Sequence, residues 1–316
     1  MPYRIAVILA AVGVTMPEVQ AQPFYVVIGD SSAFGETNRT KNPSDGDRGY
    51  VKPFADYLAG KYGIRPTVAN FAINGETSGS FFAGTGRVSS DGQGHNTNCN
   101  GLASPYAQYQ RLQDSFSVPA VNAEVKAVTV QFGANNLDAV ASSPDFLALS
   151  AERQQNLVAA ALGAFQADYA NILGDVRQRF PNADLYTMGY HNPYNGDPSH
   201  PFYPLADSAV RALNQVIEGV SSVPQFDAHY VDVYGAINPD ESTLTLMSTW
   251  QTDPVNYVHL NDDGYAAVSA ELIGTAHTAV AVPSVPEPAT LALAVVGGLA
   301  LFARRKWRGV RLATAA

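Results

Sequence analysis

The sequence predicts an α/β fold with three layers, αβα, in which a parallel sheet carries helices on both faces. Short apolar runs rich in β-branched and aromatic residues alternate with segments whose apolar residues recur every three or four positions. The short runs are almost continuously apolar, which is typical of strands buried on both faces. With 316 residues, 46% of them hydrophobic, the chain is long enough for one large domain of this kind.

Five runs are predicted as strands, with helices between them and a last helix at the end of the domain. The strands are expected at residues 24–28, 68–73, 127–132, 184–188 and 230–234. The helices are expected at residues 50–62, 157–176, 210–217 and 265–279. Such an arrangement is flavodoxin-like, and sheets of this type bind ligands beyond the carboxyl ends of their strands. The residues that directly follow each strand are therefore the candidates for a functional site.

Charge and cysteine content exclude two classes of function. The formal net charge is −9, and a cluster of basic residues at 304–311 makes the rest of the chain more acidic still. An acidic surface repels the phosphate backbone, so nucleic acid is not expected as a partner. The single cysteine, Cys99, permits neither an intramolecular disulfide nor a cysteine zinc site, and its surroundings predict a loop.

The N-terminus predicts export. Arg4 precedes an apolar run at residues 5–16, and the small residues Val19 and Ala21 follow at the positions that signal peptidases read. We therefore expect residues 1–21 to form a signal peptide and residues 22–282 to form the single folded domain.

The C-terminal residues 283–316 predict a sorting tail. Pro286-Glu287-Pro288 is followed by an apolar stretch at 289–303 and then by a basic cluster at 304–306. An apolar helix followed by positive charges is a stop-transfer arrangement, and this stretch is short for a stable transmembrane helix.

The three-part order of this tail resembles the PEP-CTERM sorting signal of Gram-negative bacteria. The resemblance implies export across the inner membrane and a transient membrane anchor. It also implies a partner, an exosortase-type membrane protease that removes the tail, and a final location at the cell surface or in the extracellular matrix.

Four residues with chemical potential lie beyond the predicted strands. Ser31 follows the first strand, Gly75 the second and Asn135 the third, while His259 precedes the last helix. A serine on such a turn can act as a nucleophile, and an imidazole can act as its general base. A glycine lets a backbone N–H approach a ligand, and an asparagine amide can donate to a developing oxyanion. Each residue alone also fits ordinary turn or capping chemistry.

Taken together and in this order, these residues resemble the SGNH, or GDSL, hydrolase family over most of residues 24–279. The resemblance implies that Ser31 is the nucleophile and His259 the general base. It also implies an oxyanion hole made of the Ser31 and Gly75 backbone amides and the Asn135 side chain. The implied reaction is the cleavage of carboxylic esters through an acyl-enzyme on Ser31, which requires no metal and no organic cofactor.

Three positions depart from the family pattern. Ser32 stands where Leu is common, Asn136 stands where Asp is usual, and Asn256 stands where the family has the Asp that orients the histidine. Asp253 offers a carboxylate three residues earlier, and Pro254 stiffens the turn after it. Because a negative charge stabilises the imidazolium, we expect Asp253 to be the third catalytic residue. Asn256 or a backbone carbonyl is the alternative orienting group.

The sequence leaves the ester open among a small-molecule, a lipid and an acetylated-polysaccharide ester. The Gly-rich segment 79–101 is a candidate lid, and the aromatic segments 190–194 and 201–203 are candidates for an acyl or sugar pocket. The alternative function is a non-catalytic surface scaffold that binds polysaccharide, which the missing carboxylate at Asn256 motivates. Retention of the serine, glycine, asparagine and histidine favours the enzyme.

Overall fold

The computed structural model describes residues 21–36, 48–83, 108–249, 252 and 257–281. Most of the predicted signal peptide, the predicted sorting tail, Cys99, Asp253 and Asn256 therefore lie outside the described residues. Contacts divide the chain into a unit at residues 1–276 and a second at residues 277–316. The sheet and the candidate site belong to the first unit.

The described residues form one five-stranded parallel sheet with the spatial order β2-β1-β3-β4-β5. This order confirms the predicted flavodoxin-like arrangement. The strands are β1 (Phe24–Gly29), β2 (Thr67–Asn70), β3 (Val125–Gln131), β4 (Asp184–Met188) and β5 (Ala228–Val231). The strand order changes direction between β1 and β3, and folds of this type bind ligands beyond the carboxyl ends of the strands at that point.

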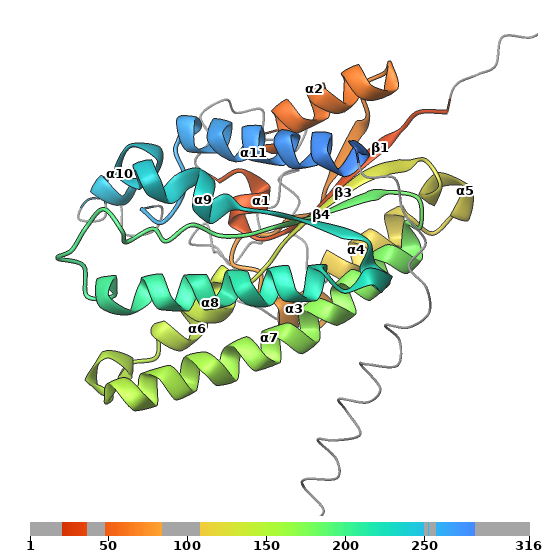
Figure 1. Cartoon of the computed structure of the whole chain (residues 1–316). Coiled ribbons are helices and arrows are strands. Elements are labelled where there is room, and N and C mark those ends of the chain that lie inside the picture. The colour runs from red at the N-terminus through yellow and green to blue at the C-terminus, as the bar shows by residue number, and fades with distance from the viewer. Residues whose placement is uncertain (1–20, 37–47, 84–107, 250–251, 253–256, 282–316) are drawn as a thin grey trace, which may run out of the picture. The chain divides into compact units, whose positions relative to one another are not determined.

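Helices cover both faces of the sheet (Figure 1), as the three-layer prediction requires. The α-helices are α1 (Ser31–Phe34), α2 (Val51–Tyr62), α3 (Ser78–Ala83), α4 (Gln108–Ser115), α5 (Pro119–Asn122), α6 (Ala134–Ala141), α7 (Ala151–Arg179), α8 (Tyr203–Ser221), α9 (Val233–Ile237), α10 (Glu241–Leu244) and α11 (Asp262–Ala281). Four 3₁₀ turns complete the described elements: η1 (Phe146–Ala148), η2 (Pro224–Phe226), η3 (Asn238–Asp240) and η4 (Met247–Thr249).

The sequence of β1 is apolar throughout because both of its faces are covered by helices. Tyr25 and Val27 pack with residues of α2 and α11, whereas Val26 and Ile28 pack with residues of α7 and α8. All four side chains are fully buried. Because successive side chains of a strand point to opposite faces, a strand with a helical layer on each face needs apolar residues at every position.

Two predicted strands end three residues earlier than expected. The second was predicted to reach Ile73 but ends at Asn70, although Phe71 and Ile73 still donate backbone hydrogen bonds to the β1 carbonyls of Val27 and Gly29. The fifth was predicted to reach residue 234 but ends at Val231, because the Asp232 side chain accepts from a backbone N–H and starts α9.

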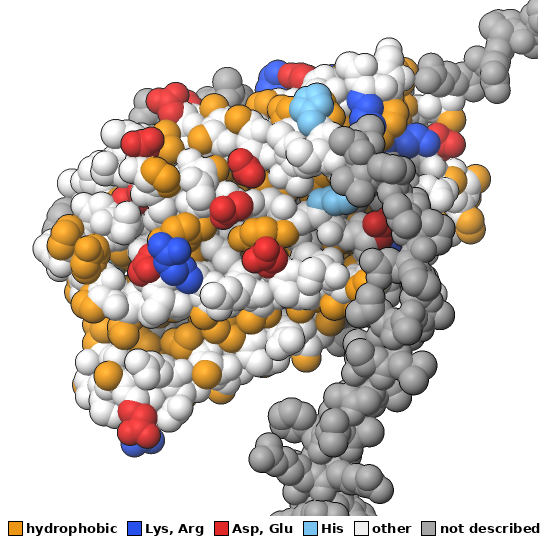
Figure 2. Space-filling model, in the orientation of Figure 1, with side chains coloured by type: hydrophobic (Ala, Val, Ile, Leu, Met, Phe, Trp, Pro, Cys, Tyr) orange, Lys and Arg blue, Asp and Glu red, His pale blue; other side chains and the backbone are white. Residues whose placement is uncertain are grey.

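The surface is sparsely charged, as the composition indicates. On the face in Figure 2, Lys and Arg side chains are scattered and most lie beside acidic ones, so no basic patch forms there. Among the described residues, no helix is both long and apolar enough to cross a membrane. The stretch 289–303, predicted as a short transmembrane helix, lies outside those residues.

Candidate active site

Ser31 and His259 are brought together by the fold. Ser31 is the first residue of α1, directly beyond β1, and His259 lies in the loop before α11. The two are 228 positions apart in sequence, yet His259 Nε2 is 2.9 Å from Ser31 Oγ. Both side chains are half-buried, so a ligand can reach them. An imidazole nitrogen at this distance from a hydroxyl is placed to take its proton.

The turn that presents Ser31 is fixed by Asp30. The Asp30 side chain caps α1, with Oδ1 accepting from Ser32 N at 3.0 Å, and its backbone carbonyl accepts from Phe34 N at 2.9 Å. An aspartate at this position satisfies backbone donors that the first turn of a helix leaves free. The Ser31 hydroxyl is thereby held beyond the strand end.

Gly75 and Asn135 meet at the same edge of the sheet. Gly75 lies in the turn after β2. Its φ is +78°, a backbone conformation that residues with a side chain rarely adopt. Asn135, in the first turn of α6, donates from Nδ2 to the Glu76 carbonyl at 3.0 Å and to Asp30 Oδ2 at 3.3 Å. Asn135 thus contacts the residue after Gly75 and the residue before Ser31. These contacts bring the three residues predicted as oxyanion donors to one region at the carboxyl edge of the sheet.

The His259 loop is held mainly by backbone pairing. His259 O accepts from Leu246 N at 2.9 Å, and Asn261 N donates to Leu244 O at 3.0 Å. The Asn261 side chain donates to Thr243 O at 2.6 Å and accepts from Gly264 N at 2.9 Å. Asn261 therefore ties the histidine loop both to the preceding segment and to the start of α11.

Asn136 explains one departure from the family pattern. Its Oδ1 accepts from Ser78 N at 3.1 Å, and its Nδ2 donates to Ser78 Oγ at 2.9 Å. Ser78 Oγ in turn donates to Asp168 Oδ2 at 3.0 Å. Because the Ser78 hydroxyl donates its proton to Asp168, it can only accept a hydrogen bond from residue 136. An amide N–H can donate this bond, whereas a carboxylate cannot. The amide at Asn136 therefore suits the contact between α6 and α3.

Asn135 contacts two residues that have buried carboxyl groups, Asp30 through its side chain and Glu76 through its backbone carbonyl. Sequence reasoning assigned a role to neither side chain. Asp30 is 1% exposed and Glu76 is 5% exposed. Burial raises the pKa of Asp30 to about 7, against hydrogen bonds from Tyr190 and Ser32 that favour the charged form. Burial also raises the pKa of Glu76, which the Ser80 hydroxyl and Gln108 Nε2 contact. In sequence each is a polar residue beside a predicted site residue, Ser31 or Gly75, and nothing there shows that its side chain is buried.

Gln108 is a further residue that sequence reasoning missed. Its fully buried amide accepts from Gly29 N at 2.8 Å and donates to Gly29 O at 2.9 Å. The Gln108 side chain thus makes the two hydrogen bonds to Gly29, the last residue of β1, that the backbone of a neighbouring strand would make. Gly29 lies two positions before Ser31. The contact spans 79 positions in sequence, so no local pattern could have shown it.

An aromatic cluster adjoins the histidine loop. Tyr194 stacks on His200 with ring centres 4.3 Å apart, and Tyr257, two residues before His259, lies 5.8 Å from His200. Phe202 completes the cluster, 5.9 Å from Tyr194. Nearby, His191 Nε2 lies 3.2 Å from Val258 O, and burial lowers the pKa of His191 to about 4. The predicted aromatic segments therefore do reach the loop that carries His259.

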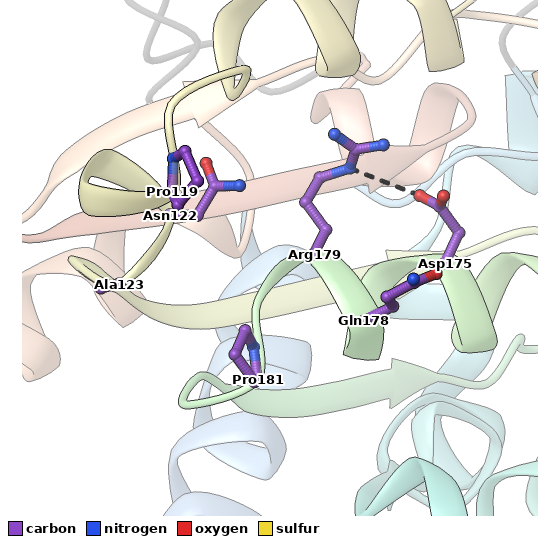
Figure 3. Close-up of a pocket in the computed structure, with 7 residues that line it drawn as sticks. All are labelled: Pro119, Asn122, Ala123, Asp175, Gln178, Arg179 and Pro181. Carbon is purple, nitrogen blue, oxygen red and sulfur yellow. Dashed lines mark hydrogen bonds and ion pairs between the residues drawn. The ribbon is translucent and has the colours of Figure 1, made fainter.

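Two cavities lie elsewhere in the described structure. One, of about 580 Å³, is lined by residues that include Asn192, Tyr203 and Asp207. The other, of about 410 Å³, is lined by seven residues that include the Asp175–Arg179 pair (Figure 3). The second lies where α5 leads into β3 and α7 into β4, which is the amino end of the sheet. Among the described residues, no group of three or more His, Cys, Asp or Glu side chains is placed to hold a metal.

Solved structures share this fold. A lipase from a goat rumen metagenome has a TM-score of 0.55 and 16% identity, over 80% of this chain and 97% of its own. A phospholipase A1 from Streptomyces albidoflavus has a TM-score of 0.52 and 15% identity, over 81% and 100%. A variant of an acetyl-xylooligosaccharide esterase from Geobacillus has a TM-score of 0.50 and 13% identity, over 80% and 93%. No curated protein sequence matches the chain.

Two family models match the chain itself. The PEP-CTERM protein-sorting motif matches residues 284–306, which confirms the resemblance of the tail. The model of the GDSL-like lipase/acylhydrolase family matches residues 27–267, a range that holds the serine, glycine, asparagine and histidine described above. The chain therefore belongs to the GDSL-like lipase/acylhydrolase family of ester hydrolases.

Proposed function

We propose that the protein is an exported serine hydrolase that cleaves carboxylic esters through an acyl-enzyme on Ser31, with His259 as general base. The observation that carries this proposal is the 2.9 Å distance between Ser31 Oγ and His259 Nε2. A non-catalytic scaffold has no need of a serine and an imidazole in hydrogen-bond contact beside a set of convergent donors.

In the first half of the reaction, Ser31 Oγ attacks the ester carbonyl while His259 Nε2 takes the hydroxyl proton. The carbonyl oxygen gains negative charge and accepts hydrogen bonds from the backbone N–H groups of Ser31 and Gly75 and from Asn135 Nδ2. Collapse of this intermediate breaks the ester C–O bond. The alcohol leaves with the proton from His259, and the acyl group stays on Ser31.

In the second half, water attacks the acyl-enzyme and His259 accepts its proton. The Ser31 Oγ–acyl bond breaks, Ser31 regains its proton from His259, and the carboxylic acid is released. Throughout, His259 needs a partner on Nδ1–H to hold the tautomer in which Nε2 is the acceptor. We assign this role to Asp253, with Asn256 as the alternative orienting residue.

The direct test compares two adjacent serines. Ser31→Ala should lower hydrolysis of p-nitrophenyl acetate and butyrate by about a thousandfold or more, because the nucleophile is lost. Ser32→Ala removes the neighbouring hydroxyl and should keep most of the activity. A fluorophosphonate probe should label Ser31, as peptide mass spectrometry can show. Equal turnover by wild type and Ser31→Ala would exclude the proposed nucleophile.

A second pair of variants addresses the partner of His259. If Asp253 orients the imidazole, Asp253→Ala should lower kcat by about a hundredfold or more, and Asn256→Asp should bring no gain. If Asn256 orients it, Asn256→Asp should raise kcat about tenfold. Unchanged turnover in Asp253→Ala would refute the assignment that we favour.

The natural ester belongs to the same proposal. The aromatic cluster (Tyr194, His200, Phe202 and Tyr257) combines apolar ring faces with the polar atoms of Tyr and His, which suits either an acyl chain or a sugar ring. Relatives of similar fold are named as lipases, a phospholipase and an acetyl-xylooligosaccharide esterase. Turnover of a phospholipid, a long-chain nitrophenyl ester and acetylated xylan, compared at equal enzyme concentration, would rank the three classes.

Export and sorting complete the proposal. The PEP-CTERM motif at residues 284–306 supports a surface destination in a Gram-negative bacterium, with an exosortase-type protease acting on the tail. Deletion of residues 285–316 should change the location of the protein without changing its kcat on a nitrophenyl ester. Loss of turnover in the truncated chain would show that the tail belongs to the catalytic domain.

A further inference from the structure

Tyr190 reaches the site from the end of β4, which is two places from β1 in the sheet. It follows β4, is 3% exposed, and its hydroxyl donates to Asp30 Oδ2 at 2.6 Å across 160 positions of sequence. Burial, and next the neighbouring Asp30 carboxylate, raise the pKa of Tyr190 well above its ordinary value, so the hydroxyl remains a donor. Asp30 directly precedes the proposed nucleophile. The proposed mechanism uses neither side chain.

The backbone of Tyr190 is fixed on both sides. The buried Asn214 side chain on α8 accepts from Tyr190 N and donates to Tyr190 O, each at 2.8 Å. At the preceding residue, Gly189, an added Cβ would come within 2.6 Å of the Tyr230 hydroxyl and 3.1 Å of Asn214 Oδ1. The segment therefore lies tightly between α8 and β5, and the Tyr190 hydroxyl has a defined position.

Both N–H groups of the Asn135 amide are occupied in this structure. One donates to the Glu76 carbonyl at 3.0 Å, and the other makes a longer contact of 3.3 Å with Asp30 Oδ2. To serve an oxyanion, Asn135 must turn one N–H toward the substrate. The long contact with Asp30 is the weaker of the two and the one more easily given up.

Tyr190 and Asn135 donate to the same oxygen of Asp30. A carboxylate oxygen has two lone pairs, and a buried carboxylate needs donors on them. With Tyr190 present at 2.6 Å, Asp30 Oδ2 keeps a strong donor while Asn135 turns away. Without that hydroxyl, Asn135 would be the remaining described side chain that donates to this oxygen. Asp30 would then compete with the oxyanion for the Asn135 N–H.

We propose that Tyr190 is a positioning residue for the hydrolytic reaction. By supplying the strong hydrogen bond to Asp30, it leaves the Asn135 amide free to donate to the oxyanion. This inference rests on the proposed ester hydrolysis and adds to it a residue that touches neither the substrate nor the reacting atoms.

The first test is Tyr190→Phe, which removes the hydroxyl and keeps the ring. We expect kcat for p-nitrophenyl butyrate to fall about 10- to 100-fold with KM changed less than twofold, because the oxyanion forms only after binding. Affinity for a trifluoromethyl ketone, which adds to the serine and carries an oxyanion, should fall by a similar factor. The matched control is Tyr186→Phe: Tyr186 is fully buried in β4, its hydroxyl has no hydrogen-bond partner among the described residues, and its loss should leave kcat unchanged.

The second test asks whether the effect passes through Asn135. In an Asn135→Ala background, which has residual turnover from the other donors, Tyr190→Phe should lower kcat less than twofold further. In an Asp30→Asn background, which retains a good helix cap but has no charge to hold Asn135, Tyr190→Phe should likewise lower kcat less than twofold. This pair of variants carries the test by itself if Tyr190→Phe does not fold in the wild-type background, as judged by circular dichroism, and a loss of about tenfold within the pair would overturn the inference.

The outcomes separate the two proposals. If the unaltered protein shows no turnover that Ser31→Ala removes, the proposed function fails and this inference fails with it. If Ser31-dependent turnover is present, three further results overturn the inference alone. They are an unchanged kcat in Tyr190→Phe, a rise in KM that accounts for the whole loss, and an equal loss in the wild-type and Asn135→Ala backgrounds.

Discussion

The oxyanion side and the histidine side of the site are held by different kinds of contact. The oxyanion side, at the ends of β1, β2 and β3, depends on buried side chains: Tyr190 and Asn135 donate to Asp30, and Gln108 donates to Glu76 and pairs with Gly29. The histidine side, the loop at residues 257–261, depends on backbone pairing with residues 244–246 and on one asparagine, Asn261.

This difference predicts different responses to substitution. A buried set of polar side chains has fixed positions and is costly to leave unpaired, so changes there should act on the transition state. A loop paired through its backbone tolerates many side chains, so changes there should act mainly on local stability and on the acid response. The following experiments separate these two kinds of effect.

The largest effect is expected from Asn135→Ala on the oxyanion side. Loss of one oxyanion donor typically lowers kcat about 100- to 1,000-fold, equivalent to about 3–4 kcal/mol, and KM should change little. The matched control is the next residue: Asn136→Ala loses its hydrogen bonds to Ser78 and should lower the melting temperature while keeping kcat within about threefold. Equal losses of kcat in both variants would contradict the placement of the oxyanion hole.

The next largest effect is expected in the pH dependence of the free energy of unfolding, through His191 beside the histidine loop. Burial lowers the pKa of His191 to about 4 from 6.5, so the folded protein binds fewer protons than the unfolded chain between these values. His191 should therefore contribute stability that is present above pH 6.5 and lost as the pH falls toward 4. The full loss is about 3 kcal/mol, from 1.4 kcal/mol per pKa unit.

Urea unfolding at pH 7.5, 6, 5 and 4.5 measures this effect. Carboxyl groups also titrate in this range, so the quantity of interest is the difference between wild type and His191→Gln. The free energy of unfolding should fall less steeply with acid in the variant. Parallel slopes for the two proteins would show that His191 does not carry the acid response.

The smallest effect is expected from Asn261→Ala. This change removes the side-chain bonds to Thr243 O and Gly264 N but leaves the backbone pairing of His259 O with Leu246 N. We expect kcat to fall about tenfold or less, because the imidazole is less well placed but still present. Amide hydrogen exchange at Leu246 should become faster, since that N–H reports whether the loop is closed. Unchanged exchange at Leu246 would mean that backbone pairing alone holds the histidine loop.

The sequence by itself determined the fold class and the order of the principal site residues. Alternating apolar runs and helical periodicities predicted the parallel sheet, because strands buried on both faces have a distinctive pattern. Ser31, Gly75, Asn135 and His259 could be proposed as site residues because each follows a strand or precedes a helix at the expected edge and because their order resembles that of a known family. Strand ends were less predictable: a single local hydrogen bond, such as the Asp232 cap, decides them.

Only the tertiary structure decided which residues support the site. Tyr190 is 160 positions from Asp30, and Gln108 is 79 positions from Gly29. In sequence a buried tyrosine that packs and one that donates to a carboxylate look the same, as Tyr186 and Tyr190 illustrate. Their difference lies in what the fold places opposite each hydroxyl, and that depends on contacts between distant strands. Local sequence patterns carry information about burial and turns. A specific hydrogen bond depends on where the fold places the donor relative to the acceptor, which local patterns do not contain.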